Sequence, residues 1–240
     1  AAPKCLPAPC CPEIIMKVLG VVTKHEWEDL TDRARNYLKW ITVKAEAIDE
    51  LAPQPLHTTT RGFELLAIDR DGNSFGEIVE RSQELGIPSV LVRFASLIAT
   101  FLTVRLLRQQ MGRDREVMPS LTFSQNVDAN YLNYPRTLKT LLELFPEYKE
   151  MFYFEINEEI TEDYLTTIRA LADDLGIRLA LDDTNKMNIN VHHKLLDLAD
   201  WVKIDFEATA NLEQQLLSGY GEKIILHFEE YALGARSPVI

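Results

Sequence analysis

Three short apolar runs between Met151 and Asp205 constrain the fold of this chain more than any other feature of its sequence. The runs are Phe152–Phe154, Leu179–Leu181 and Trp201–Val202, and charged residues follow each of them. The segments between them have the lengths and patterns of helices, so strand and helix alternate. This alternation calls for parallel strands joined by crossover helices. In such folds ligands lie at the carboxyl ends of the strands, which here are acidic.

The same alternation extends over most of the chain. Strands are predicted at Gly62–Ile68, Ser120–Ser124, Phe152–Ile156, Leu179–Leu181, Trp201–Ile204 and Ile224–Phe228. Helices are predicted at Phe75–Leu85, Pro88–Met111, 131–144, Thr161–Leu175, His192–Leu198 and Leu212–Leu217. The segment Val90–Val92 would also allow a strand. The fold class is therefore α/β, a TIM-like barrel, and the sequence leaves open whether the barrel is incomplete at the C-terminus. Six strands are counted, and an eight-stranded barrel would need further units after Phe228.

The first fifty residues read as an N-terminal extension. Residues 1–12 form an irregular arm, and Pro12–Val22 could be a helix or a strand, because its periodicity does not decide between them. Asp29–Ala47 predicts a helix from apolar residues spaced by three and four. Pro53-Gln54-Pro55 then breaks the pattern, and its segment could add one more strand. We place a domain boundary near residue 50, giving residues 1–50 as a helical extension and residues 51–240 as the barrel.

Charge and cysteine content exclude several classes of function. The chain has 240 residues and a formal net charge of −12, which argues against a DNA binder that relies on bulk charge. Its three cysteines all lie in the first eleven residues, where they cannot cross-link a core, so we expect reduced thiols and a cytoplasmic protein. The apolar stretch Val90–Leu107 contains Arg93 and Arg105, and we expect no membrane span.

The acidic strand ends predict a site for hard cations. Side chains alternate along a strand, so Lys203 and Asp205 point the same way, and one residue of the Asp182-Asp183 pair points inward. Oxygen-bearing side chains near strand ends are Glu64, Asn126, Glu155, Asp182 and Asp183. Such oxygens suit Mg²⁺ or Mn²⁺ better than zinc, and two such ions can hold a phosphodiester and activate water. Taken singly, each Asp could equally be a helix cap or a turn former.

Several short motifs, in order along about residues 50–231, resemble those of the EAL domain of bacterial cyclic di-GMP signalling. They are Gln54-Pro55-Leu56, Gly62-Phe63-Glu64-Leu65-Leu66, Asn126 six residues before Leu132, Phe154-Glu155-Ile156-Asn157-Glu158, Asp182-Asp183 and Trp201-Val202-Lys203-Ile204-Asp205. Leu65 stands where the family has Ala. Each motif is weak alone, and their order and spacing carry the resemblance.

The resemblance implies a TIM-like barrel in which, in active members, two Mg²⁺ or Mn²⁺ ions and a Lys hydrolyse cyclic di-GMP to the linear dinucleotide. It implies metal ligands at Glu64, Asn126, Glu155, Asp182 and Asp183. It gives catalytic positions to Lys203, to Glu158, which would brace the loop after the Asp pair, and to His227. It gives ligand-binding positions to Gln54, Asp205 and Glu230.

Three departures from the family pattern concern the chemistry. Ile68 stands where the family has an Arg that holds a ligand phosphate. The loop Thr184–Met187 lacks both glycines of the family's Phe-Gly-Thr-Gly, and with them the freedom to adopt positive φ. His227 stands where the family has a Glu that assists the catalytic site, although Glu230 keeps the second Glu of that motif.

Two hypotheses follow. The first is a degenerate EAL-like signalling domain that binds cyclic di-GMP or a protein partner with little or no hydrolysis, and that could form a homodimer. The second is an active Mg²⁺- or Mn²⁺-dependent cyclic di-GMP phosphodiesterase, favoured by the retained Glu64, Asn126, Glu155, Asp pair and Lys203. In the first, Mg²⁺ or Mn²⁺ is a cofactor only if the metal site functions.

Overall fold

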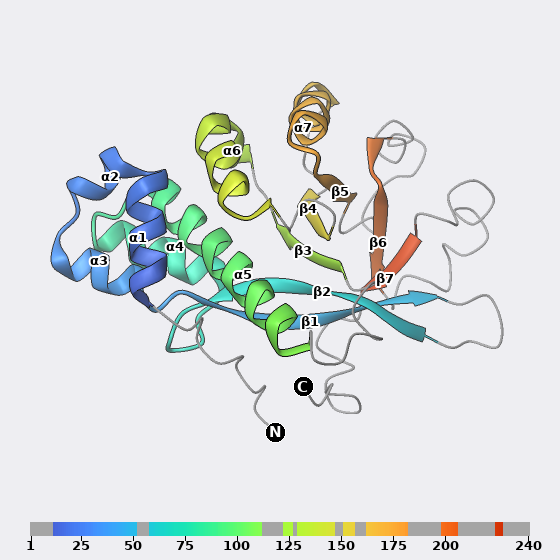
Figure 1. Ribbon diagram of the computed structural model, residues 1–240, viewed down its shortest axis with the longest axis horizontal. Helices are drawn as coiled ribbons and strands as arrows, with labels where there is room; N and C mark the ends of the chain where they lie inside the picture. Colours follow the sequence, from blue (N-terminus) through green and yellow to red (C-terminus); the bar gives the residue numbers. More distant parts are fainter. Residues whose placement is uncertain are drawn as a thin grey trace. The chain divides into compact units, whose positions relative to one another are not determined.

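Seven strands form a closed barrel in the computed structural model of the chain. Figure 1 shows its helices and strands. The structure describes residues 12–51, 58–111, 122–126, 129–146, 151–156, 162–181, 198–205 and 224–227. The strands are β1 (Thr42–Leu51), β2 (Thr58–Ile68), β3 (Thr122–Asn126), β4 (Phe152–Ile156), β5 (Arg178–Leu181), β6 (Trp201–Asp205) and β7 (Ile224–His227). Neighbours from β2 to β7 pair in parallel, which confirms the prediction of a TIM-like α/β barrel.

The barrel closes through β1. This strand pairs antiparallel with β7, with Ile48 opposite His227 and Asp49 opposite Leu226. The described strands therefore form a closed barrel, in which β1 supplies the closing edge. Residue 50, where we place the domain boundary, lies within β1.

The chain divides into two compact units. The helical unit comprises Ala1–Ala45, Leu65–Pro119 and Ala129–Tyr148, and the barrel unit comprises Glu46–Glu64, Ser120–Asp128 and Lys149–Ile240. The division runs through β1 and β2. In the barrel unit, the helix α7 (Glu162–Leu175) packs against β5.

The helical unit is built on one long apolar helix. Its helices are α1 (Pro12–Val22), α2 (Lys24–Glu28), α3 (Asp32–Leu38), α4 (Phe75–Glu84), α5 (Ser89–Met111), the 3-10 helix η2 (Ala129–Asn133) and α6 (Pro135–Leu144). Helices α1 and α4 both pack against α5 (Figure 1). Leu91, Phe94, Leu97 and Phe101 of α5 are fully buried. Burial of such side chains contributes about 1.5–3 kcal/mol each relative to exposure.

Two predicted helices have different bounds in the structure. The helix predicted over Asp29–Ala47 ends at Leu38, and β1 begins at Thr42. Ile41 and Val43 are buried on either side of a partly exposed Thr42, which is the alternation of a strand. The segment 131–144 divides into η2 and α6 at Pro135, because a proline disfavours helical backbone in the residue before it.

The remaining helices in the described chain fit the predictions more closely. Helix α4 begins at Phe75 and gives way to Gly86, which has a φ of +67°. The segment 12–22, for which the sequence allowed a helix or a strand, is a helix. Helix α5 includes residues 90–92, so the alternative of a strand at 90–92 was wrong. The predicted helices at His192–Leu198 and Leu212–Leu217 lie almost wholly outside the described residues.

Helix α5 meets the length and composition expected of a membrane span. Its window Ser89–Leu106 includes Arg93 and Arg105 and has a mean hydropathy of 1.6, so the helix is long and apolar enough to cross a membrane. However, 83% of this window is buried inside the protein. Buried core helices pass the same test, and we describe α5 as the core helix of the helical unit.

Candidate functional site

The strand register brings several predicted site residues onto one face of the barrel. Paired residues of neighbouring parallel strands share a face, and side chains alternate along each strand. Glu64 on β2 is paired with Ser124 on β3. Two residues further along β3, Asn126 is paired with Glu155 on β4. Glu64, Ser124, Asn126 and Glu155 therefore lie on the same face.

The pairing carries this face across β5 to β7. On β5 the next partner is Ala180, which is itself paired with Trp201 on β6. Lys203 and Asp205 follow Trp201 at intervals of two, and Asp205 is paired with His227 at the end of β7. This register fits the prediction that Lys203 and Asp205 share a face, which is also the face of the predicted metal ligands.

A ring contact identifies this face as the barrel interior. The rings of Tyr153 on β4 and Trp201 on β6 stack with centroids 3.9 Å apart and an interplanar angle of 16°. These strands are separated by β5, so they are about 10 Å apart. Their side chains can meet only on the concave side of the sheet, above the small residue Ala180. The opposite face carries apolar residues such as Phe63 and Phe123, whose rings also stack.

The interior face buries two carboxylates. Glu64 is 3% exposed, and Glu155 is fully buried. Asn126, at the carboxyl end of β3, is exposed. Buried carboxylates in proteins are paired, hydrogen-bonded or bound to metal ions, and two of them on one face make this face the candidate site. The described part of the predicted site is thus one interior face that carries Glu64, Asn126 and Glu155, with Asn126 at the carboxyl end of its strand.

Five predicted site residues lie outside the described residues. They are Gln54, Glu158, Asp182, Asp183 and Glu230, and the loop Thr184–Met187 lies there too. For Lys203, Asp205 and His227 the structure gives the register position. The roles proposed for all eleven residues remain predictions.

The described candidate ligands have the chemistry that a hard cation prefers, but they are fewer than such a cation needs. No group of three His, Cys, Asp or Glu side chains that could hold a metal ion occurs in the described ranges. Glu64, Asn126 and Glu155 supply two carboxylates and one amide, and the Asp pair would follow directly after β5. Carboxylate and amide oxygens without His or Cys suit Mg²⁺, Mn²⁺ or Ca²⁺.

Ser124 is a member of this face that the sequence analysis missed. Its side chain is fully buried, and its Oγ has no hydrogen-bond partner among the described residues. The spacing could have identified it, because it precedes Asn126 by two positions on a strand. The neighbouring Gln125 points to the opposite face, where its Oε1 is also buried without a partner in the described chain.

The amino-terminal ends of β4 to β6 are held together by a polar cluster. Arg178 donates from Nη1 to the Tyr153 hydroxyl over 2.8 Å. Burial raises the pKa of Tyr153, against the opposing effect of Arg178. Asp200 accepts hydrogen bonds from the Leu179 amide and from Arg169, each over 2.8 Å. This cluster fixes the end of the barrel away from the predicted site.

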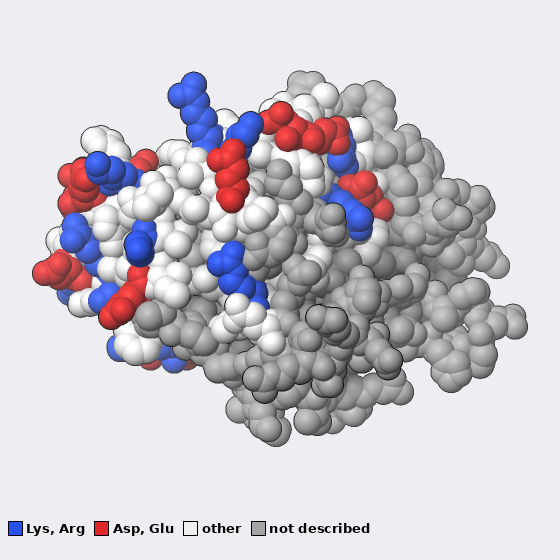
Figure 2. Space-filling model, in the orientation of Figure 1, with Lys and Arg blue, Asp and Glu red and all other residues white. Residues whose placement is uncertain are grey.

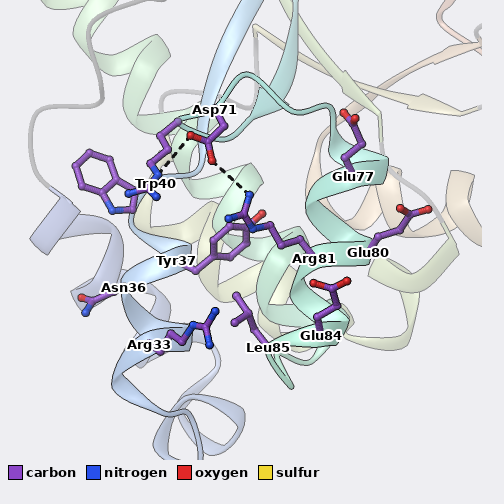
Figure 3. Close-up of a pocket in the computed structure, with 11 residues that line it drawn as sticks. Arg33, Asn36, Tyr37, Trp40, Asp71, Glu77, Glu80, Arg81, Glu84 and Leu85 are labelled. Carbon is purple, nitrogen blue, oxygen red and sulfur yellow. Dashed lines mark hydrogen bonds and ion pairs between the residues drawn. The ribbon is translucent and has the colours of Figure 1, made fainter.

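A separate groove lies in the helical unit, between α3 and α4 (Figure 3). It has a volume of about 610 Å³. Arg81 extends from α4 across the ring of Tyr37 and forms an ion pair with Asp71 over 3.3 Å. Arg70 lies 3.6 Å from the same carboxylate. Three charged residues of the groove, Arg70, Asp71 and Arg81, are thus paired with one another, and the lining contains none of the predicted site residues.

A buried carboxylate anchors the turn beside this groove. The Tyr37 hydroxyl donates to Asp69 over 3.3 Å. Burial and the Asp69 charge raise the pKa of Tyr37 to about 12. Burial tends to raise the pKa of Asp69, but hydrogen bonds from Asn73, Asp71 and Tyr37 lower it below its ordinary value. These pKa shifts result from the hydrogen bonds that hold the turn in place, and they do not indicate a catalytic site.

Charged side chains of both signs are mixed on the face that Figure 2 shows, where Lys and Arg lie among Asp and Glu. The described residues of this face therefore present no continuous basic stripe of the kind that binds a phosphate backbone.

Comparisons with known proteins show which solved structures share this fold. No protein-family model and no curated protein matches this sequence. Solved structures do match. One is a Vibrio cholerae LapD S helix-GGDEF-EAL structure bound to c-di-GMP, with a TM-score of 0.53 and 13% identity over 90% of this chain and 51% of that one. Another is the FimX EAL domain from Pseudomonas aeruginosa bound to c-di-GMP, with a TM-score of 0.53 and 13% identity over 88% and 83%.

A third match is a calcium/cy-diGMP complex of Klebsiella pneumoniae BlrP1, with a TM-score of 0.51 and 18% identity over 72% of this chain and 42% of that one. The chain spans about half of the LapD structure. At these identities the likeness shows the fold alone. The chain has the fold of EAL domains, as its motifs suggested.

Proposed function

We propose that this chain is a cyclic di-GMP signalling domain that binds the dinucleotide at the carboxyl ends of its barrel strands, with little or no hydrolysis. The observation that carries the proposal is the register that puts Glu64, Asn126, Glu155, Lys203 and Asp205 on one interior face. The fold supports it, because the FimX and LapD structures named above are bound to c-di-GMP.

Electrostatics argues that binding depends on a divalent cation. Each phosphodiester of the dinucleotide carries a negative charge, and the interior face buries Glu64 and Glu155. A nucleotide phosphate would be repelled by these carboxylates unless a cation lay between them. Glu64, Asn126 and Glu155, with Asp182 and Asp183, would hold it. Such a cation supplies charge neutralisation and, in an enzyme, an activated water. Lys203 would add a second positive charge.

The proposal of weak hydrolysis rests on the sequence. Ile68 cannot bind a phosphate as the corresponding Arg does, and His227 replaces a Glu near the predicted site. The loop Thr184–Met187 also lacks glycine. Removing one preorganised group from an active site costs about 10²–10³ in kcat, so combined changes could bring turnover close to zero.

Turnover and retention of the nucleotide test this proposal together. The purified chain is dialysed to equilibrium against cyclic di-GMP with Mn²⁺, and both chambers are analysed by chromatography. We expect the nucleotide to accumulate in the protein chamber without conversion to the linear dinucleotide. Absence of accumulation would contradict nucleotide binding and favour a protein partner.

Active phosphodiesterase is the second candidate, because the carboxylates Glu64 and Glu155 are retained and buried. It predicts conversion to the linear dinucleotide in the same experiment. That conversion should be lost in Glu64→Gln and unchanged in Glu84→Gln, which alters an exposed carboxylate on α4.

A further inference from the structure

The buried hydroxyl of Ser124 is unexplained by packing. Its side chain is fully buried in β3, and Oγ has no hydrogen-bond partner in the part of the chain that the structure describes. A buried polar group without a partner is destabilising, and in most proteins such a group is satisfied by water or by a ligand. An alanine would fill the same place without that cost. Because this hydroxyl lies on the face of the predicted cation site, paired with Glu64, we look for a role that appears only when the site is occupied.

Its neighbours indicate what it would meet. Ser124 is paired with Glu64 on the adjacent strand, about 5 Å away in backbone terms, and it precedes Asn126 by two positions on the same face. Glu155 is the partner of Asn126 and so lies diagonally across from Ser124. Ser124 thus shares its face with Glu64, Asn126 and Glu155, the described residues that would hold a hard cation. A serine hydroxyl can donate to a carboxylate and accept from a metal-bound water.

We propose that Ser124 is an additional positioning residue of the cation site, whose hydroxyl hydrogen-bonds the carboxylate of Glu64 or a water of the cation when Mn²⁺, Mg²⁺ or Ca²⁺ is bound. The proposal rests on the proposed function in requiring a cation at this face. Outer-shell partners of this kind orient the ligands, and their loss typically lowers metal affinity by 10–100-fold.

This role predicts opposite effects on the protein with and without metal. In Ser124→Ala the unpaired hydroxyl is gone, so the metal-free protein should unfold at a higher temperature, by about 2–4 °C. The same variant should bind Mn²⁺ about 10–100-fold more weakly, with a smaller Mn²⁺-induced rise in unfolding temperature. A serine retained only for packing would leave the response to Mn²⁺ unchanged.

Thr100→Val is the matched control. Thr100 lies in α5 of the helical unit, is fully buried, and has an Oγ1 that also lacks a partner in the described chain. Replacing it with valine removes a hydroxyl and keeps the volume. This variant should gain stability without metal and bind Mn²⁺ as the unmodified protein does. Ser124→Cys, which keeps a weak donor of similar size, should have intermediate affinity.

The experiment is a calorimetric titration with Mn²⁺ alone, together with thermal unfolding with and without Mn²⁺. Weakened binding in Ser124→Ala but not in Thr100→Val supports the role. Equal affinity in all three proteins overturns it and leaves the proposed function intact. If the unmodified protein does not bind Mn²⁺ and Glu64→Gln gives the same titration, both the role of Ser124 and the proposed cation-dependent function are overturned. If Ser124→Ala does not fold, an unaltered affinity in Ser124→Cys overturns the role of the hydroxyl.

Discussion

The buried carboxylate of Asp69 holds the turn between β2 and α4 in place. It is 2% exposed, and its Oδ1 accepts from the amides of Asp71 and Asn73 over 2.8 and 3.1 Å. Its Oδ2 accepts from Asn73 Nδ2 over 3.0 Å and from the Tyr37 hydroxyl. These bonds lower its pKa below that of the unfolded chain, which is about 3.9. The resulting stability is present above pH ~4 and is lost as the pH falls through the folded-state pKa.

Asp69→Asn should therefore destabilise the protein and reduce its sensitivity to acid. The amide would keep an acceptor at Oδ1 but would turn a donor toward Tyr37 and Asn73, and a buried unsatisfied donor costs about 1–3 kcal/mol. Urea unfolding at pH 7 and at pH 3.5 measures both effects. Glu80→Gln, an exposed change on α4, is the control. Equal loss of stability between the two pH values in Asp69→Asn and the unmodified chain would contradict this account.

Single residues also show where sequence reasoning reached its limit. The prediction that Lys203 and Asp205 share a face needed only the two-residue period of a strand. The same period could have placed Ser124 on the face of Asn126, two positions further on. The pairing of Ser124 with Glu64 could not be predicted, because register depends on the whole barrel. The structure does not describe Asp182 and Asp183, so that part of the predicted site still rests on the motif alone.

At the scale of elements, two glycines of one helix region should respond in opposite directions to alanine. Gly86 follows α4 with a φ of +67°, whereas Gly76 lies within the helix, and a Cβ at either would meet no atom within 4 Å. An added methyl group therefore clashes with nothing at either position, and the backbone conformation alone determines the effect of alanine on stability. Gly86→Ala should cost about 1–2 kcal/mol. Gly76→Ala should stabilise by about 0.5–1 kcal/mol.

Chemical denaturation of the two variants measures this difference directly. Equal midpoints for Gly76→Ala and Gly86→Ala would show that the left-handed backbone at residue 86 is not the limiting feature there. The sequence was sufficient for this element, because Phe75, the Leu85-Gly86 pair and Pro88 are local signals.

Other elements could not be predicted locally. The residues after Leu38 continue a helical spacing as far as Ile41, yet the chain turns there into β1. Both patterns fit Leu38 and Ile41, and the pairing of β1 with β7 is what favours the strand. A pairing with a strand almost 180 residues away leaves no local signal, and tertiary context overrides propensity in such cases.

At the scale of the whole molecule, the barrel depends on closure by β1. This strand lies between β2 and β7 in the closed order, so its backbone amides face a neighbour on both sides. Ile48→Pro removes one of those amides and leaves a partner carbonyl unsatisfied, which should cost more than about 2 kcal/mol. Ile48→Val keeps the backbone and is the control. Urea unfolding that gives both variants the same stability would show that closure at β1 contributes little.

The central claim is that the interior face of the barrel binds cyclic di-GMP through a divalent cation. Calorimetric titration of the nucleotide into the chain, with Ca²⁺ and then with EDTA, tests it most directly, because Ca²⁺ accompanies cy-diGMP in the BlrP1 complex. The matched variants are Glu64→Gln on the interior face and Glu84→Gln on α4. The account predicts binding with Ca²⁺ in the unmodified chain and in Glu84→Gln, and loss of binding in EDTA and in Glu64→Gln. Binding of equal strength in EDTA, or in Glu64→Gln, would contradict it.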